Sequence, residues 1–111
     1  MSRSALFIDR DGTLIKEPPV TFQVDTLEQL EFLPGVIRNL YYIRKNPEYE
    51  LVMVTNQDGL GTPAYPLENF DRVQGKMLEI LAGEGVTFDN ILIDASLPEE
   101  NAQQGSPARV F

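Results

Sequence analysis

The chain has 111 residues, of which 42% are hydrophobic, which is enough to build the core of one small domain. Nine lysine and arginine residues against seventeen aspartate and glutamate residues give a net charge of −8, which argues against nucleic acids and anionic membranes as partners. The absence of cysteine and histidine excludes disulfides, thiolate zinc sites and imidazole bases. With no run approaching the ~20 apolar residues of a membrane span and no signal-peptide pattern, the sequence predicts a soluble cytoplasmic protein.

Two carboxylates, Asp9 and Asp11, follow the first apolar run of the chain. Residues 4–9 form a short and almost continuously apolar run, which predicts a strand buried on both faces of a parallel sheet. Ligands of open α/β sheets bind outside the carboxyl ends of the strands, and Gly12 permits a sharp turn at this position. The two carboxylates can therefore share a divalent cation, with one of them available as a nucleophile.

The segment after this strand is irregular until the first helix. Residues 10–18 are rich in turn formers, residues 25–29 predict a helical turn, and residues 30–33 predict a short extended piece. Apolar side chains then recur at helical spacing, which predicts an amphipathic helix over residues 36–46. Pro47 ends this helix, since proline cannot continue it.

The second half of the chain repeats the alternation of strand and helix. Residues 51–54 predict a second uninterrupted apolar strand, followed by a loop with two glycines over residues 58–66. One apolar stripe predicts a helix over residues 67–83, and residues 89–94 predict a third strand. The polar tail over residues 95–111 is typical of a loop.

This order of elements predicts a single α/β domain over residues 1–111, with its core in residues 4–94. Strands that alternate with helices at this spacing form βαβαβ units, which give a Rossmann-like parallel sheet in a three-layer architecture. The three predicted strands end at Asp9, Thr55 and Asp94. Because parallel strands end at the same edge of a sheet, these three side chains are expected along one edge.

The residues at this edge suit phosphoryl transfer, which needs a nucleophile, a metal, donors to the phosphoryl oxygens and an acid–base group. Asp9 can form an aspartyl-phosphate, and Asp11 can protonate the leaving alkoxide and later activate water. Thr55 and Asn56 offer a hydroxyl and an amide as donors to the phosphate.

Backbone N–H groups in the two loops at Arg10–Asp11 and Asn56–Gln57 can complete a cradle for the phosphate. Each of these short patterns also has an ordinary structural explanation. Asp-x-Asp is common in turns and on solvated surfaces, and Thr-Asn is common in caps and turns. The context favours the functional interpretation, because each pattern directly follows an apolar strand.

These residues resemble a known family. Residues 7–15, Phe-Ile-Asp-Arg-Asp-Gly-Thr-Leu-Ile, resemble the first motif of the haloacid dehalogenase superfamily of phosphatases, and residues 54–57, Val-Thr-Asn-Gln, resemble its second. More narrowly, the chain is similar over residues 4–101 to the histidinol-phosphate phosphatase branch. The segments that carry this narrower similarity are residues 17–19, 23–27, 32–36, 56–62 and 88–89.

The resemblance implies a role for each matching residue. Asp9 is expected to be the nucleophile and a magnesium ligand, and Asp11 the general acid–base and a magnesium ligand through its backbone carbonyl. Gln57 and the loop after it are expected to face the substrate. The expected residues that bind substrate or phosphate are Arg10, Thr55, Asn56 and Gln57. In this family the domain is often the N-terminal half of a bifunctional enzyme, fused to imidazoleglycerol-phosphate dehydratase.

The late part of the chain departs from the family pattern. Many members carry a zinc loop of cysteines and a histidine, but no zinc is expected here because those positions hold Asp94, Ser96, Ala102 and Gln104. The Arg-Lys-Pro that normally follows reads Gly-Ser-Pro over residues 105–107. In the family a fourth strand then leads to the aspartates that complete the magnesium site, and neither is found in the 111 residues. The chain is therefore expected to be a truncated or altered form of the domain, with a sheet that is incomplete at its C-terminal side. Such an open edge invites dimerisation or a covering loop.

The resemblance implies a magnesium-dependent phosphomonoester hydrolase that forms an aspartyl-phosphate, with L-histidinol phosphate as substrate, in histidine biosynthesis. One alternative is a phosphatase of sugar bisphosphates such as heptose bisphosphate, which shares the first two motifs. Another is a non-catalytic domain that keeps affinity for phosphate, which the missing late motifs favour. A phosphoacceptor receiver domain fits less well, because receivers carry the acidic pair and the phosphoacceptor on separate strands.

Overall fold

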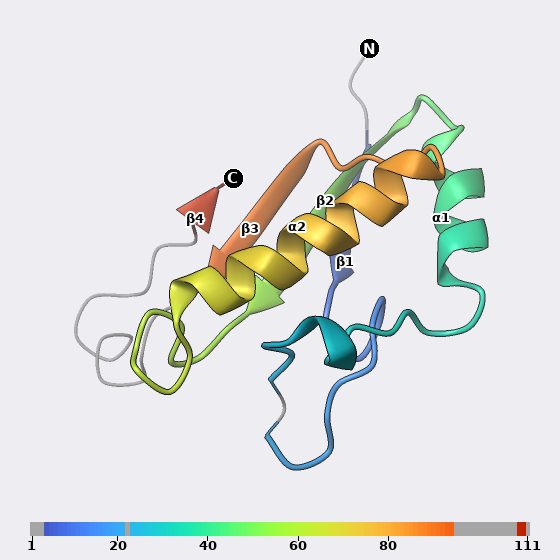
Figure 1. Ribbon diagram of the computed structural model, residues 1–111. Helices are drawn as coiled ribbons and strands as arrows, with labels where there is room; N and C mark the ends of the chain where they lie inside the picture. Colours follow the sequence, from blue (N-terminus) through green and yellow to red (C-terminus); the bar gives the residue numbers. More distant parts are fainter. Residues whose placement is uncertain (1–3, 22, 95–108, 111) are drawn as a thin grey trace.

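The computed structural model describes residues 4–21, 23–94 and 109–110, which form an α/β fold with a parallel sheet (Figure 1). Strands and helices alternate along the chain up to residue 94, as predicted. The elements are β1 (Ser4–Asp9), η1 (Leu27–Gln29, a 3-10 helix), α1 (Val36–Arg44), β2 (Tyr49–Asn56), α2 (Leu67–Gly83), β3 (Asn90–Asp94) and β4 (Arg109–Val110).

The sheet brings the ends of the first three strands together. Its strand order is β1-β2-β3-β4, and β2 pairs in parallel with both β1 and β3. In this register Asp9 lies beside Val54, Val54 lies beside Leu92, and Asn56 lies beside Asp94. The predicted meeting of the strand ends at one edge is therefore confirmed.

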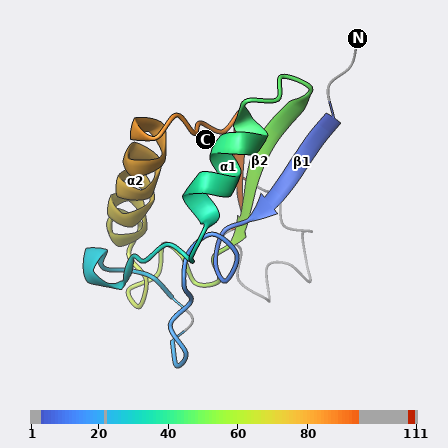
Figure 2. The same ribbon diagram turned by 90° about the vertical axis from the view of Figure 1, so that its right-hand side faces the viewer.

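Both helices pack on the same face of the sheet (Figure 2). The chain moves across the sheet in one direction, from β1 to β2 through α1 and from β2 to β3 through α2. Two right-handed crossovers in the same direction place both helices on one side of the sheet. No helix in the described part of the chain is long and apolar enough to cross a membrane. The core between sheet and helices contains Leu40 from α1, Met53 from β2, Ile91 and Ile93 from β3, and Phe70, Val73, Met77 and Leu81 from α2.

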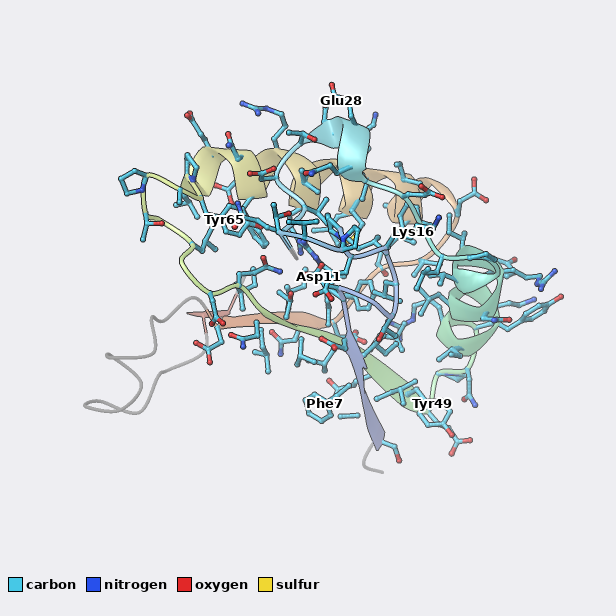
Figure 3. The ribbon with its side chains drawn as sticks, turned by 90° about the horizontal axis from the view of Figure 1, so that it is seen from below. Phe7, Asp11, Lys16, Glu28, Tyr49 and Tyr65 are labelled. Atoms are coloured by element: carbon cyan, nitrogen blue, oxygen red, sulfur yellow. The ribbon has the colours of Figure 1, made fainter. Side chains whose placement is uncertain are left out.

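The opposite face of the sheet has no helix over it in the described residues, so these residues supply two of the three predicted layers. Phe7 projects from this face, away from Tyr65 and the helices (Figure 3), and 61% of its surface is exposed. The prediction that residues 4–9 are buried on both faces is therefore wrong. An apolar run indicates only that a strand can be buried, and among the described residues β1 is an edge strand whose one neighbour is β2.

The predicted loop over residues 95–111 needs a partial correction. Arg109 and Val110 form β4, which pairs antiparallel with β3 through Leu92 and Ile93. The edge of β3 offers unpaired N–H and C=O groups, and a β-branched residue such as Val110 suits a strand. Residues 95–108 and 111 lie outside the described residues, as do the predicted departures at 96, 102, 104 and 105–107.

Candidate active site

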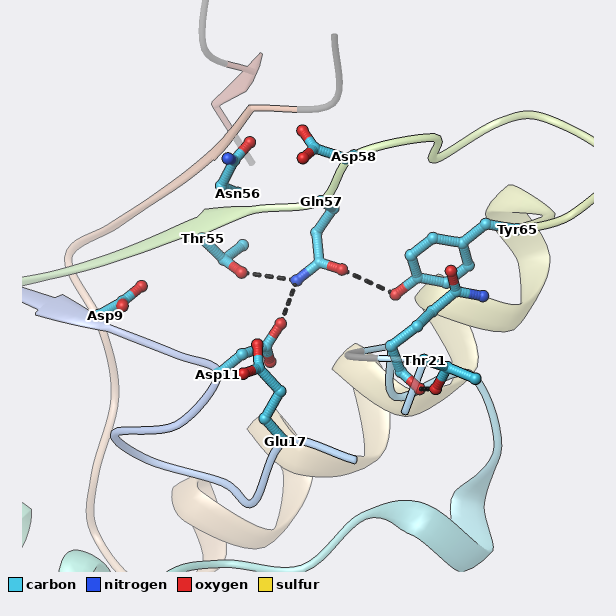
Figure 4. A pocket seen from close by; sticks show the side chains of 10 residues that line it. Asp9, Asp11, Glu17, Thr21, Thr55, Asn56, Gln57, Asp58 and Tyr65 are labelled. Carbon is cyan, nitrogen blue, oxygen red and sulfur yellow. Dashed lines mark hydrogen bonds between the residues drawn. The ribbon is translucent and has the colours of Figure 1, made fainter. Parts of the chain in front are cut away.

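A pocket of about 440 Å³ opens at the carboxyl ends of β1 and β2 (Figure 4). Its walls come from three places: the strand ends, the segment after β1, and the loop between β2 and α2. Among the described residues the lining includes four carboxylates and no lysine or arginine. The lining residues are Asp9, Asp11, Glu17, Thr21, Gln23, Thr55, Asn56, Gln57, Asp58 and Tyr65.

Asp9 stands at the end of β1 with an exposed side chain, so its carboxylate is accessible from the pocket. Its Oδ1 accepts a 3.1 Å hydrogen bond from the backbone N–H of Arg10. The same N–H also donates to the carbonyl oxygen of Val54 at 3.1 Å, which continues the pairing with β2 past the end of β1. The position of Asp9 is therefore set by the sheet itself.

A tight turn brings Asp11 back to the pocket. The carbonyl oxygen of Arg10 accepts hydrogen bonds from the N–H groups of Leu14 at 2.8 Å and Ile15 at 3.2 Å. Gly12 stands in this turn with φ of 81°, in the left-handed region that favours glycine, and its N–H donates to the carbonyl of Ile15 at 2.8 Å. The Asp-x-Asp-Gly pattern thus encodes a specific turn at the strand end.

Asp11 differs from Asp9 because both of its carboxylate oxygens are held. Oδ1 accepts a 2.8 Å bond from Arg10 Nε, and Oδ2 accepts a 2.7 Å bond from Gln57 Nε2. Only 11% of the Asp11 side chain is exposed. An accessible carboxylate suits a nucleophile and a fixed one suits an acid–base group, so the geometry agrees with the two different roles expected for the pair.

Gln57 links the two strand ends. Its Nε2 also donates to Thr55 Oγ1 at 2.6 Å, and its Oε1 accepts a 2.8 Å bond from the Tyr65 hydroxyl. Its backbone N–H donates to the carbonyl of Asp94 at the end of β3 at 2.8 Å. The structure therefore brings together Asp9, Asp11, Thr55, Asn56 and Gln57, as the sequence predicts.

Arg10 is the predicted site residue that the structure places elsewhere. Its side chain is fully buried beneath the pocket, where Nη1 donates to Gln74 Oε1 at 2.8 Å and the guanidinium lies 5.0 Å from the centre of the Phe70 ring. This position does not fit a ligand of the phosphate. The predicted backbone cradle needs a partial correction, because the N–H groups of Arg10 and Gln57 already donate to Val54 and Asp94. For the N–H groups of Asp11 and Asn56 the cradle stays a prediction.

Sequence reasoning also missed several residues of the site. Tyr65 and Thr21 lie in loops without periodicity. Glu17, Gln23 and Asp58 lie in segments that carry the family resemblance, but the sequence assigned none of the three an individual role in the pocket. Gln74 had a usable signal, because it lies four residues after Phe70 on the apolar stripe of α2. A polar residue at a core position of a helix indicates a buried hydrogen-bond partner.

Burial raises the pKa of Tyr65 to about 12, an effect that the Arg10 cation opposes and the Asp11 carboxylate increases. The raised pKa stabilises the folded state fully below pH ~10, where an unfolded tyrosine is still protonated. This contribution, about 2–3 kcal/mol, is then expected to be lost as the pH rises from about 10 to 12. Urea denaturation across this range measures it.

Tyr65→Phe is the control for this pH dependence. The variant is expected to be less stable at neutral pH, because Gln57 Oε1 loses its donor, but to lose less further stability than the wild type between pH ~10 and 12. Equal losses in the two proteins over that range would show that the titration of Tyr65 is not coupled to folding.

Oxygen ligands at the strand ends fit part of a magnesium site. Mg²⁺ prefers carboxylate, carbonyl and water oxygens in octahedral geometry. The Asp9 carboxylate is accessible, whereas each side-chain oxygen of Asp11 already accepts a hydrogen bond, from Arg10 or from Gln57, which favours the backbone carbonyl of Asp11 as the metal ligand. Among the described residues, no group of three or more His, Cys, Asp and Glu side chains is arranged to hold a metal ion.

Known proteins similar to this chain cover it almost completely. No protein-family model matches the sequence. The chain is 58% identical over 107 residues to the histidine biosynthesis bifunctional protein HisB of Bacteroides fragilis, which aligns 96% of this chain with 29% of that protein. It is 50% identical over 107 residues to HisB of Campylobacter jejuni, covering 96% of this chain and 30% of that protein. The chain therefore spans less than a third of the length of these relatives.

Two solved structures of phosphatases have a fold similar to that of this chain. The D,D-heptose 1,7-bisphosphate phosphatase of B. bronchiseptica, complexed with magnesium and phosphate, aligns with 87% of this chain and 52% of its own length, with a TM-score of 0.76 and 23% identity. A candidate HAD-like phosphatase from Mesorhizobium loti aligns with 85% of this chain and 43% of its own, with a TM-score of 0.69 and 29% identity. The chain is therefore similar over almost its whole length to part of the HisB proteins, and it has the fold of the haloacid dehalogenase-like phosphatases.

Proposed function

We propose that the chain is a magnesium-dependent phosphomonoester hydrolase that acts through an aspartyl-phosphate. The observation that carries this proposal is one pocket at the strand ends that contains an accessible carboxylate, Asp9, a fixed carboxylate, Asp11, and the hydroxyl of Thr55. These are the nucleophile, the acid–base group and a donor to the phosphoryl oxygens. The similarity to HisB proteins and the phosphatase fold support the same chemistry.

The reaction has two steps that share the same groups. A carboxylate oxygen of Asp9 attacks phosphorus and the ester P–O bond breaks, while protonated Asp11 gives its proton to the departing alkoxide, which leaves as an alcohol. In the second step Asp11 takes a proton from water, and the hydroxide formed attacks the aspartyl-phosphate, which releases inorganic phosphate and restores Asp9. Thr55 and Asn56 donate to the phosphoryl oxygens in both steps.

Magnesium would be held by the Asp9 carboxylate and the Asp11 carbonyl, with waters and ligands from outside the described residues completing its coordination. When bound, it neutralises phosphate charge in a pocket whose lining is acidic. The resemblance further implies a dehydratase domain in the same polypeptide. We propose this fusion to a dehydratase domain, and we also propose a cytoplasmic location.

We propose L-histidinol phosphate as the substrate, because the pocket carries two carboxylates, Glu17 and Asp58, in addition to Asp9 and Asp11. Such a lining attracts a substrate whose alcohol part carries a positive charge, and the amine of histidinol does so. A heptose bisphosphate has no cation, and its second phosphate would meet these carboxylates. The charge of the pocket thus favours histidinol phosphate over the sugar bisphosphate.

Phosphate release at millimolar magnesium tests this substrate, with both phosphate esters compared at low salt. The kcat/KM for histidinol phosphate is expected to exceed that for heptose bisphosphate by about tenfold or more, since 1.4 kcal/mol of differential interaction is tenfold. The double variant Glu17→Gln, Asp58→Asn is expected to reduce this preference, as is high salt. A preference for the bisphosphate, unchanged in the double variant, would contradict the assignment.

A second candidate is a domain that binds phosphate without turnover. It is favoured by one observation, that the described residues contain no cluster of three acidic or other metal ligands. Two assays separate the candidates: phosphate release by the 111-residue chain, and release by the same chain extended to the length of the HisB relatives. If only the extended protein is active, the 111 residues contribute the nucleophile and the extension contributes the remaining ligands of the magnesium ion.

A further inference from the structure

The Asp11 carboxyl is held from two sides by side chains that are themselves buried. Arg10 Nε reaches Oδ1 from the protein interior. Gln57 Nε2 reaches Oδ2 from the position directly after β2 (Figure 4). Arg10 is 0% and Gln57 3% exposed. Because the two donors bind different oxygens, rotation of the carboxyl group breaks at least one charge-assisted hydrogen bond.

The Arg10 side is anchored to α2. Its guanidinium contacts Gln74 and the ring of Phe70, which lie four residues apart and therefore one turn apart on this helix. Its Nη2 atom is buried without a hydrogen-bond partner among the described residues. An apolar residue at this position would avoid that unfavourable burial but could not donate to Asp11 and Gln74, so the contacts of the arginine indicate a task beyond filling space.

The Gln57 side is oriented by Tyr65. The buried hydroxyl of Tyr65 donates to Gln57 Oε1, which turns the amide NH₂ group toward Asp11 and Thr55. The reversed amide would point its oxygen at a carboxylate oxygen, and two acceptors would then face each other. Tyr65 as donor and Asp11 as acceptor therefore favour the same orientation of the amide, the one that donates to Asp11.

The same amide affects the Thr55 hydroxyl. Thr55 Oγ1 accepts a 2.6 Å hydrogen bond from Gln57, so its own proton must point in another direction. Thr55 lines the pocket together with Asp9 and Asn56. The hydroxyl proton is thus available for an oxygen atom of a ligand in the pocket.

We propose that Arg10 and Gln57 are positioning residues, which fix Asp11 for proton transfer, and that Gln57, oriented by Tyr65, also presents Thr55 as a hydrogen-bond donor. This inference rests on the proposed phosphatase function. It assigns the two side chains a different task from the phosphate binding expected from the sequence. Neither side chain needs to touch the phosphoryl group.

The first test needs no activity. In the ¹⁵N-labelled chain, the side-chain amide protons of Gln57 are expected to exchange with water at least about tenfold more slowly than those of Asn39, which is exposed on α1. Tyr65→Phe is expected to remove this difference and to shift both Gln57 signals. Unchanged Gln57 signals and exchange in Tyr65→Phe would overturn the role of Tyr65 in orienting the amide.

The second test separates kcat from KM. Gln57→Leu removes the donor, and Gln57→Glu keeps the shape but replaces the donor with an acceptor. Both are expected to lower kcat roughly 10–100-fold, with KM within about threefold of the wild type. Asn39→Leu and Asn39→Asp are the matched controls and are expected to leave both constants unchanged. Full kcat in Gln57→Glu, or a loss confined to KM, would overturn the proposal.

Arg10→Lys tests the interior side of Asp11. Lysine keeps the positive charge but cannot contact Asp11, Gln74 and Phe70 together as the planar guanidinium does, so kcat is expected to fall about tenfold or more at similar KM. A rise in KM at constant kcat would identify Arg10 as a phosphate ligand and overturn its positioning role. If the wild-type protein releases no phosphate, the proposed function fails, and the exchange measurement still decides whether Gln57 is held as described.

Discussion

Asp9→Asn is expected to reduce phosphate release roughly 10³-fold or more, because an amide cannot form the aspartyl-phosphate. The substitution keeps the shape of the side chain. The amide oxygen can still accept the hydrogen bond from the N–H of Arg10, so the end of β1 is expected to remain in place. Steady-state release of phosphate at millimolar magnesium measures the effect, with circular dichroism to confirm that the variant is folded.

Asp71→Asn is the matched control for this substitution. Asp71 is exposed on α2 outside the pocket, and its replacement removes the same single negative charge from the protein. Its activity is expected to stay within about twofold of the wild type, since distant surface charges are screened by salt. Equal activity in Asp9→Asn and Asp71→Asn would rule out the aspartyl-phosphate mechanism.

The strands, helices and most of the site could be predicted because their signals are local. Val36–Arg44 and Leu67–Gly83 carry apolar residues at helical spacing, and each is helical in the structure. Asp9 and Thr55 each follow an apolar strand, and parallel pairing then brings them to the same edge. This inference needs only the topology, which the alternation of strands and helices determines.

The role of Arg10 could not be predicted in the same way. Its neighbours in sequence, Asp9 and Asp11, both reach the pocket, and an arginine between them looks like a phosphate ligand. The direction of its side chain depends instead on Gln74 and Phe70, which lie far later in the chain on α2. The residues around Arg10 carry no sign of this long-range contact, and Gln74 on the apolar stripe of α2 indicates a buried partner without identifying it.

The exposure of Phe7 has a similar cause. Whether the outer face of β1 is covered depends on elements packed against it, not on the strand. The hydrophobic pattern of residues 4–9 permits burial on both faces, but the described residues cover only the face toward α1 and α2. An open sheet edge is expected from the sequence, but nothing in the local pattern shows that Val110 pairs with Leu92 at that edge.

Phe70→Ala is expected to lower the free energy of unfolding by about 3–5 kcal/mol, the usual cost of removing a buried aromatic ring. Phe70 is 1% exposed, and its ring contacts Tyr65 edge-on at 6.4 Å and supports the Arg10 guanidinium at 5.0 Å. The total free energy of unfolding of a small domain is only about 5–15 kcal/mol, so this single change is expected to unfold much of the protein at physiological temperature. Urea denaturation followed by circular dichroism measures it.

Two further variants identify which property of the ring matters. Leu67→Ala changes a residue of the same helix that is 38% exposed, and it is expected to cost less than about 1 kcal/mol. Phe70→Leu keeps most of the apolar volume but removes the π face that Arg10 contacts, so an intermediate loss of about 1–2 kcal/mol is expected. A loss in Phe70→Leu no larger than in Leu67→Ala would show that the ring stabilises Arg10 by its volume alone, with no contribution from its charge distribution.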